Sequence, residues 1–232
     1  MLISEKTKKA TSAVFISAEV IFTVLVQFVG GRANDVISFI SVLLACAFAV
    51  LFLEKSTKYV LTQAALVFTV LADFFLVIVE PPARLLAMLF FIAVQISYCI
   101  RIIIENKAPR VNKIHIILRF AISALSVLLA FFVLGEKADA LALVSVLYFA
   151  NLLLNVAFAF VGFKSSPHLP IGLLLFAFCD IFVGLSMIDS YLQISEGTLI
   201  YALANPGFNA AWLFYIPAQT FLALSLKKQA TR

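Results

Sequence analysis

Long apolar runs that are almost free of charge constrain this chain more than any other feature. Each run has about 19–24 residues, which at 1.5 Å per residue is enough for an α-helix to cross about 30 Å of hydrocarbon. The runs lack the alternation of a membrane β-barrel, so helices are the expected element. The sequence therefore predicts an all-α, polytopic membrane protein with eight transmembrane helices, at 12–30, 34–53, 57–79, 84–104, 113–134, 140–163, 168–188 and 208–226.

The composition supports the same fold class. Of the 232 residues, 64% are hydrophobic and 12% charged, and the mean hydropathy is +1.11. A soluble domain is about 45–50% apolar and about 25% charged. Eight spans leave no room for a separate soluble domain, so residues 1–232 form a single integral membrane domain. Nucleic-acid-binding modules, secreted disulfide scaffolds and water-soluble enzymes are excluded, and no nucleic-acid partner is expected.

The distribution of basic residues predicts the orientation. Thirteen Lys and Arg residues fall on one side of the predicted membrane and three on the other, with Arg119 just inside the fifth span. Because cytoplasmic loops carry the basic excess, both termini are predicted to be cytoplasmic and the long loop 189–207 external. The protein is then a multi-pass membrane protein, in the cell membrane if it is bacterial. The larger set is Lys6, Lys8, Lys9, Lys55, Lys58, Arg101, Lys107, Arg110, Lys113, Lys164, Lys227, Lys228 and Arg232, and the smaller one Arg32, Arg84 and Lys137.

No metal or cofactor site is expected. Cys46, Cys99 and Cys179 lie inside apolar runs without a close Cys or His partner, so they are interpreted as packing residues. His115 and His168 fall at predicted cytoplasmic helix ends and have no metal-ligand spacing.

Two carboxylates lie where lipid-facing helices should be apolar. Asp73 and Asp180 are six and eight residues from the predicted outer ends of their spans. An intramembrane carboxylate costs about 2.5–3.5 kcal/mol on insertion scales, so each is a functional hypothesis by default. Three other spans carry amides that, with the aspartates, form one layer roughly 9–17 Å below the outer boundary. These amides are Gln95, Asn151 and Gln219.

Structural interpretations remain open for the other polar groups. An Asn or Gln taken alone often joins two helices by a hydrogen bond. Glu19, in the first span, either snorkels or pairs with a basic group, or has a function. Two aspartates at matching depth favour a functional site.

A short internal similarity also indicates a duplication. Asp73 and Asp180 are each followed two residues later by an aromatic residue, and each of these spans precedes one with a central Gln. Helices four apart in order cross the membrane in the same direction. The pattern is typical of a 4+4 parallel internal repeat whose halves share a central site.

Four local motifs resemble the YhhN family of membrane lysoplasmalogenases. They are LVFTVLADFFLVI, FFIAVQISYCIRI, LLLFAFCDIFVGL and WLFYIPAQTFLAL, in the family's order. Two positions depart from the family pattern. Ala72 stands where the family usually has Gly, and Gln95 stands where it usually has His. A glutamine cannot carry a proton as a histidine does.

The resemblance implies cleavage of the vinyl-ether bond of lysoplasmalogens to a fatty aldehyde and a glycerophospho-base. The expected partners are a lysophospholipid substrate and membrane lipid. An acid and a carboxylate can supply both steps of this hydrolysis, and Asp73 and Asp180 are the expected pair. The residues expected to bind or orient the substrate are Gln95, Tyr98, Asn151, Tyr215 and Gln219. The alternatives are a small transporter or lipid-binding protein that uses the same polar layer, and a structural membrane subunit.

Overall fold

The structure, a computed structural model, describes residues 5–50, 57–106, 108–162 and 167–226. Every regular element in these ranges is helical, which confirms the all-α prediction. A π-helical segment, Phe74–Ile78, continues α3, and short 3-10 turns follow α5 and α7. The α-helices are α1 (Glu5–Leu25), α2 (Gly31–Val50), α3 (Thr57–Asp73), α4 (Arg84–Glu105), α5 (Pro109–Leu134), α6 (Ala140–Gly162), α7 (His168–Met187), α8 (Leu199–Ala204) and α9 (Ala210–Leu224).

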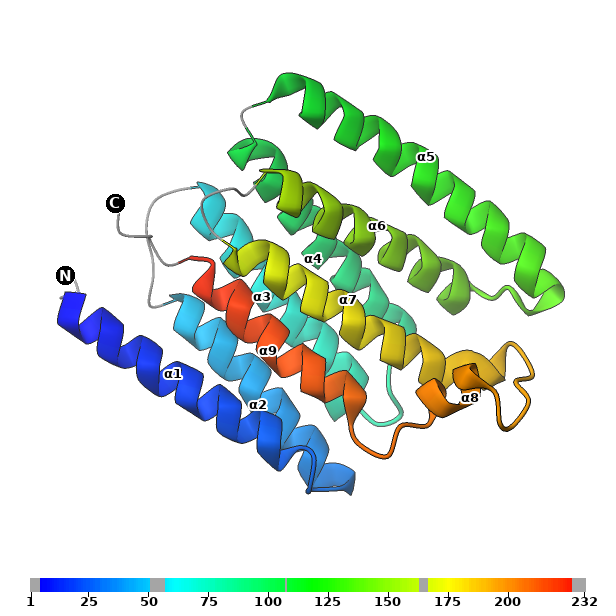
Figure 1. Cartoon of the computed structure of the whole chain (residues 1–232), viewed down its shortest axis with the longest axis horizontal. Coiled ribbons are helices and arrows are strands. Elements are labelled where there is room, and N and C mark those ends of the chain that lie inside the picture. The colour runs from blue at the N-terminus through cyan, green and yellow to red at the C-terminus, as the bar shows by residue number, and fades with distance from the viewer. Residues whose placement is uncertain (1–4, 51–56, 107, 163–166, 227–232) are drawn as a thin grey trace.

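The long helices lie side by side in one bundle, with α1 and α5 at opposite edges (Figure 1). Helix α3 packs most extensively against α4, and α7 against α9. These four helices and α6 supply the main buried core. The start of α1 and the end of α9 lie at the same end of the bundle, and the short helix α8 lies at the other (Figure 1).

Six helical stretches of the described residues are long and apolar enough to cross a membrane, so the protein is an integral multi-pass membrane protein. The stretch at α9 has 15 residues and covers only about 22 Å. Helix α1 carries Lys8, Lys9 and Glu19. The count of eight spans therefore stays a prediction. The six are Gly31–Val50, Tyr59–Ile78, Arg84–Glu105, Pro109–Lys137, Ala140–Gly162 and His168–Ser190.

The helix that overlaps the predicted first span, 12–30, begins and ends earlier than that range. Helix α1 begins by Glu5, because the segment up to Leu25 has no Gly or Pro to stop it and basic side chains are compatible with a helix. The chain then turns, and α2 starts at Gly31, whose φ of +61° favours glycine.

Arg101 is not a loop residue, contrary to its place among the cytoplasmic loop charges. It lies inside α4 and is 2% exposed. Its Nη1 donates to Thr62 Oγ1 of α3 at 2.6 Å and to Ser225 Oγ, just after α9, at 2.7 Å. This arginine joins three helices near the end of the bundle where α9 finishes.

The orientation across the membrane stays a prediction. Much of the basic set that supports it lies outside the described residues, namely Lys55, Lys107, Lys164, Lys227, Lys228 and Arg232.

Helices α7 and α9 approach each other closely at Gly172. A Cβ atom at this glycine would lie 2.8 Å from Leu222 Cγ and 3.0 Å from the Leu222 backbone nitrogen. Small residues allow such close contact between membrane helices. This contact fixes the spacing between the helices that carry Asp180 and Tyr215.

Candidate functional site

Two aspartate–tyrosine pairs lie inside the bundle. The hydroxyl of Tyr215 in α9 donates to Asp73 Oδ2, at the end of α3, over 2.7 Å. The hydroxyl of Tyr148 in α6 donates to Asp180 Oδ2 in α7 over 2.5 Å. Four helices thus supply two carboxyl groups, each held by one phenol.

Aromatic rings connect the two pairs. The ring centroid of Phe91 lies 5.7 Å from that of Tyr148 and 5.9 Å from that of Phe176. The Phe176 ring in turn lies 5.2 Å from Tyr215, at 65°. The two aspartates predicted at matching depth therefore belong to one neighbourhood of the bundle.

The two aspartates differ in how deeply the protein buries them. Asp73 is 2% exposed, whereas Asp180 is only partly buried. Asp73 is also the last residue before the π-helical segment, in which the amide of Val79 bonds to the carbonyl of Phe74. Such segments are rare and occur frequently at functional sites.

The amides of α4 and α6 form a second polar group. Asn155 Nδ2 donates to the side-chain and backbone oxygens of Gln95, both at 2.9 Å. Arg119 of α5 donates to Asn155 Oδ1 at 2.6 Å and also to Asn151 Oδ1. Because a guanidinium only donates, the 2.9 Å contact from Arg119 Nη2 makes His115 Nε2 an acceptor.

Several buried polar atoms have no hydrogen-bond partner among the described residues. They include the side-chain nitrogen and oxygen of Gln219, the side-chain nitrogen of Gln95, His115 Nδ1, Arg119 Nε and the hydroxyl of Tyr98. Such atoms are rare in native interiors and call for a specific explanation, such as a bound water or ligand. Gln219 is fully buried, four residues after Tyr215 on α9.

The predicted site residues thus divide into separate places. Tyr215 lies with Asp73, and Gln95 lies with Asn151 through Asn155 and Arg119. The phenol of Tyr98 interacts electrostatically with Arg101 and Cys46, and no described contact links it to either aspartate.

The comparisons with known proteins place the chain in a family. The model of the YhhN family matches residues 33–226, which is most of the chain. The chain belongs to the YhhN family. The match starts within α2, and all four motifs that carried the resemblance lie inside it. No curated protein and no solved structure matches the chain.

Two residues that contact the predicted site residues, Tyr148 and Arg119, were not singled out from the sequence. Tyr148 sits in a mostly apolar run, and nothing in that run shows that it faces Asp180. Arg119 was counted only as a charge near the membrane edge. A spacing in the sequence could have identified Arg119. His115 and Arg119 are four residues apart on α5, and Asn151 and Asn155 are four apart on α6. This spacing puts each pair on one helix face.

Position 95, where the motif resemblance leads us to expect a histidine, holds Gln95, and no histidine stands close to it in the sequence. In space, however, His115 is joined to Gln95 through Arg119 and Asn155. His115 is 1% exposed and stacks on Phe158 at a centroid distance of 3.9 Å, so it is buried inside the bundle.

Within the described ranges, no group of three His, Cys, Asp or Glu residues could hold a metal ion. The expectation that the protein needs no metal or cofactor stays a prediction.

Proposed function

We propose that this protein is a lysoplasmalogenase that hydrolyses the vinyl-ether bond of a lysophospholipid, with Asp73 and Asp180 as the acid–base pair. The observation that carries the proposal is the two linked Asp–Tyr pairs in the interior of a YhhN-family bundle. The phenols hold each carboxyl group in one orientation, which proton transfer to a defined carbon requires.

The reaction needs one acid and one base. A carboxylic acid adds its proton to the vinyl carbon remote from the ether oxygen, which leaves an oxocarbenium ion. The other carboxylate takes a proton from water as the water oxygen bonds to the cationic carbon. The resulting hemiacetal breaks its bond to the glycerol oxygen, which receives a proton, and fatty aldehyde is released. One water is consumed, and both carboxyl groups can return to their starting states.

Two neighbouring carboxyl groups suit this division of labour. Like charges in a low-dielectric interior repel, which favours one proton shared between the two groups. Asp180 is also less deeply buried by protein than Asp73, so the two groups have different surroundings.

The amide groups are assigned orienting roles. The unpartnered amide of Gln219 lies one helical turn beyond Tyr215 and is suited to hold water or the glycerol oxygen. Gln95 and Asn151 belong to the Arg119 group. Tyr98 is retained as an orienting residue because its buried hydroxyl has no partner among the described residues.

The same proposal includes eight membrane passes with both termini cytoplasmic. Among the described residues, eight α-helices of 15 or more residues lie side by side, and the described chain starts and ends at the same end of the bundle (Figure 1). The proposal also includes a 4+4 parallel internal repeat, in which α3 of the first half corresponds to α7 of the second, and α4 corresponds to α9. The closest packing partners, α3 with α4 and α7 with α9, agree with that relation.

The test is release of fatty aldehyde from choline or ethanolamine lysoplasmalogen by the purified protein, measured by mass spectrometry. The matched control is the 1-acyl lysophospholipid with the same head group, which has no vinyl ether and should yield no aldehyde. Failure with both plasmalogen head groups would favour the transporter or lipid-binding alternative.

A further inference from the structure

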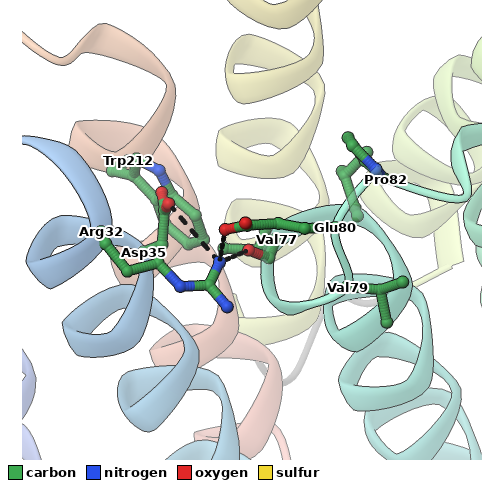
Figure 2. A pocket seen from close by; sticks show the side chains of 8 residues that line it. Arg32, Asp35, Val77, Val79, Glu80, Pro82 and Trp212 are labelled. Atoms are coloured by element: carbon green, nitrogen blue, oxygen red, sulfur yellow. Dashed lines mark hydrogen bonds and ion pairs between the residues drawn. The ribbon is translucent and has the colours of Figure 1, made fainter.

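A cavity of about 300 Å³ lies at the end of the bundle where α2 and α9 begin. Its wall carries charges of both signs and one indole, from Arg32, Asp35, Glu80 and Trp212 (Figure 2). Trp212 is the only tryptophan of the chain. A cation, two anions and an aromatic face in one cavity match a ligand that itself carries both charges.

The cavity adjoins the candidate catalytic site through two residues. The ring of Trp212 lies 5.3 Å from that of Tyr215, which holds Asp73. Leu76, three residues after Asp73 in the π-helical segment, also lines the cavity. A ligand in the cavity is therefore separated from the Asp73 pair by little more than one aromatic ring.

Arg32 is held in place but keeps donors for an anion. Its Nη1 donates to the carbonyl of Val77 at 2.9 Å, and its Nη2 to that of Ile78 at 2.6 Å. Nη1 also pairs with Glu80 at 3.0 Å. Within the described residues these contacts use Nη1 and one N–H of Nη2, which leaves Nε–H and the second N–H of Nη2 without a described partner. Guanidinium N–H groups of this kind bind phosphate oxygens.

The depth of the cavity fits a phospholipid. The side chains of Arg32 and Asp35 are about half exposed and that of Glu80 is 74% exposed, all at the bundle end that faces the head groups in the proposed eight-span arrangement. Asp73 is five residues before the end of the π-helical segment, so it lies deeper in the bundle than Glu80. In a lysophospholipid the phosphate and the ether oxygen are separated only by the glycerol carbons, so the ether oxygen likewise lies just inside the head group.

We infer that this cavity binds the zwitterionic phospho-amine head group of the single-chain lipid whose ether bond reaches Asp73. Arg32 binds the phosphate, while Glu80 and Asp35 face the ammonium group. The Trp212 indole adds a cation–π contact that is strongest for a quaternary ammonium. The inference rests on the proposed function for the identity of the lipid, and it adds the part of the molecule that recognises the head group.

The emission of Trp212 reports on the cavity directly, without any reaction. The full-length protein in detergent is titrated with glycerophosphocholine and glycerophosphoethanolamine, and separately with inorganic phosphate and glycerol. A saturable change is expected with both glycerophospho-bases and not with glycerol. Arg32→Gln should weaken binding by about tenfold or more, because a charge-assisted contact to phosphate is lost. Arg84→Gln, the same charge change on an exposed residue outside the cavity, should stay within about twofold of the parent.

A second variant, Glu80→Gln, tests the cavity even if Arg32→Gln fails to fold. Glu80→Gln leaves the Arg32 contacts to Val77 and Ile78 intact, and it should weaken glycerophosphocholine binding without weakening phosphate binding. The inference is overturned if neither glycerophospho-base changes the emission saturably, or if Arg32→Gln and Arg84→Gln behave alike. Equal responses to phosphate and glycerophosphocholine would also overturn it, because they would mean a site for bare phosphate.

This experiment separates failure of the inference from failure of the proposed function. Asp73→Asn should retain the fluorescence titration. Head-group binding without aldehyde release would contradict the lysoplasmalogenase proposal and leave the cavity assignment standing. Aldehyde release without a saturable change in Trp212 emission would contradict the cavity assignment and leave the lysoplasmalogenase proposal standing.

Discussion

Tyr215 and Asp73 are 142 residues apart in the chain and are joined by a hydrogen bond of 2.7 Å between α9 and α3. The same tyrosine packs against Phe176 on one side and Trp212 on the other. It therefore connects one aspartate with the second Asp–Tyr pair and with the charged cavity at the bundle end. Changes at Asp73 and Tyr215 can separate chemistry from packing in this region.

Asp73→Asn and Asp180→Asn are each expected to abolish vinyl-ether hydrolysis while the protein stays inserted and folded. Asn keeps the size of Asp but can neither donate an acid proton nor hold a negative charge. Loss of general acid or base catalysis costs about 10²–10⁴ in rate. Aldehyde release is measured on monodisperse protein, with Asp189→Asn on the exposed turn after α7 as the matched control. A residual rate above about a tenth of the parent would remove that aspartate from the mechanism.

Tyr215→Phe and Tyr148→Phe are expected to lower kcat about tenfold with little change in KM, because each removes the group that orients a carboxyl. The stability cost should be small, since a hydrogen bond between membrane helices averages about 0.6 kcal/mol. Tyr191→Phe is the control, because it removes a phenol–carboxylate contact, to Asp139 at 3.2 Å, outside the membrane. If Tyr191→Phe lowers kcat as much as the other two, the orienting role is contradicted.

Gln95→His is expected to raise the rate of aldehyde release by about tenfold or more, because it supplies a proton carrier that an amide cannot replace. A histidine nitrogen can still accept the hydrogen bond that Asn155 gives to the Gln95 side chain. The measurement is the aldehyde assay over a range of pH, compared with the parent. An unchanged or lower rate would mean that position 95 takes no part in proton transfer in this chain.

Gly172→Ala is expected to destabilise the bundle, because the new Cβ would lie 2.8 Å from Leu222 Cγ and the backbone of α9 cannot easily move. Overpacking of this kind typically costs about 1–3 kcal/mol. Gly184→Ala, in the same helix, meets no atom within 4 Å and should leave stability unchanged or raise it through helix propensity. The melting temperatures of the two variants in the same detergent decide the matter, and equal values would contradict the close α7–α9 contact.

Glu196→Cys, in loop 189–207, is expected to react with a membrane-impermeant thiol reagent in intact cells, on a background in which the three native cysteines are replaced. Lys9→Cys, exposed near the start of α1, should react only after permeabilisation. The excess of basic residues on the side of the termini is the physical reason. The opposite labelling pattern would reverse the orientation.

The sequence by itself determined the helical fold class, the membrane environment and most helix limits. These depend on the length and hydropathy of local segments, so they can be read from the chain without knowing the fold. Local composition also identified Asp73 and Asp180, because a carboxylate inside an apolar run is costly wherever the helix packs.

Only the tertiary structure decided which side chains meet. In a membrane both the lipid-facing and the protein-facing sides of a helix are apolar, so the hydrophobic pattern does not show how a helix is rotated. Within α7, for example, Phe176 is fully buried between the two Asp–Tyr pairs, whereas Phe178 is 41% exposed. The pairing of Tyr148 with Asp180, the joining of His115 to Gln95 and the placing of Arg32 beside Trp212 all depend on such rotations and on contacts between distant segments.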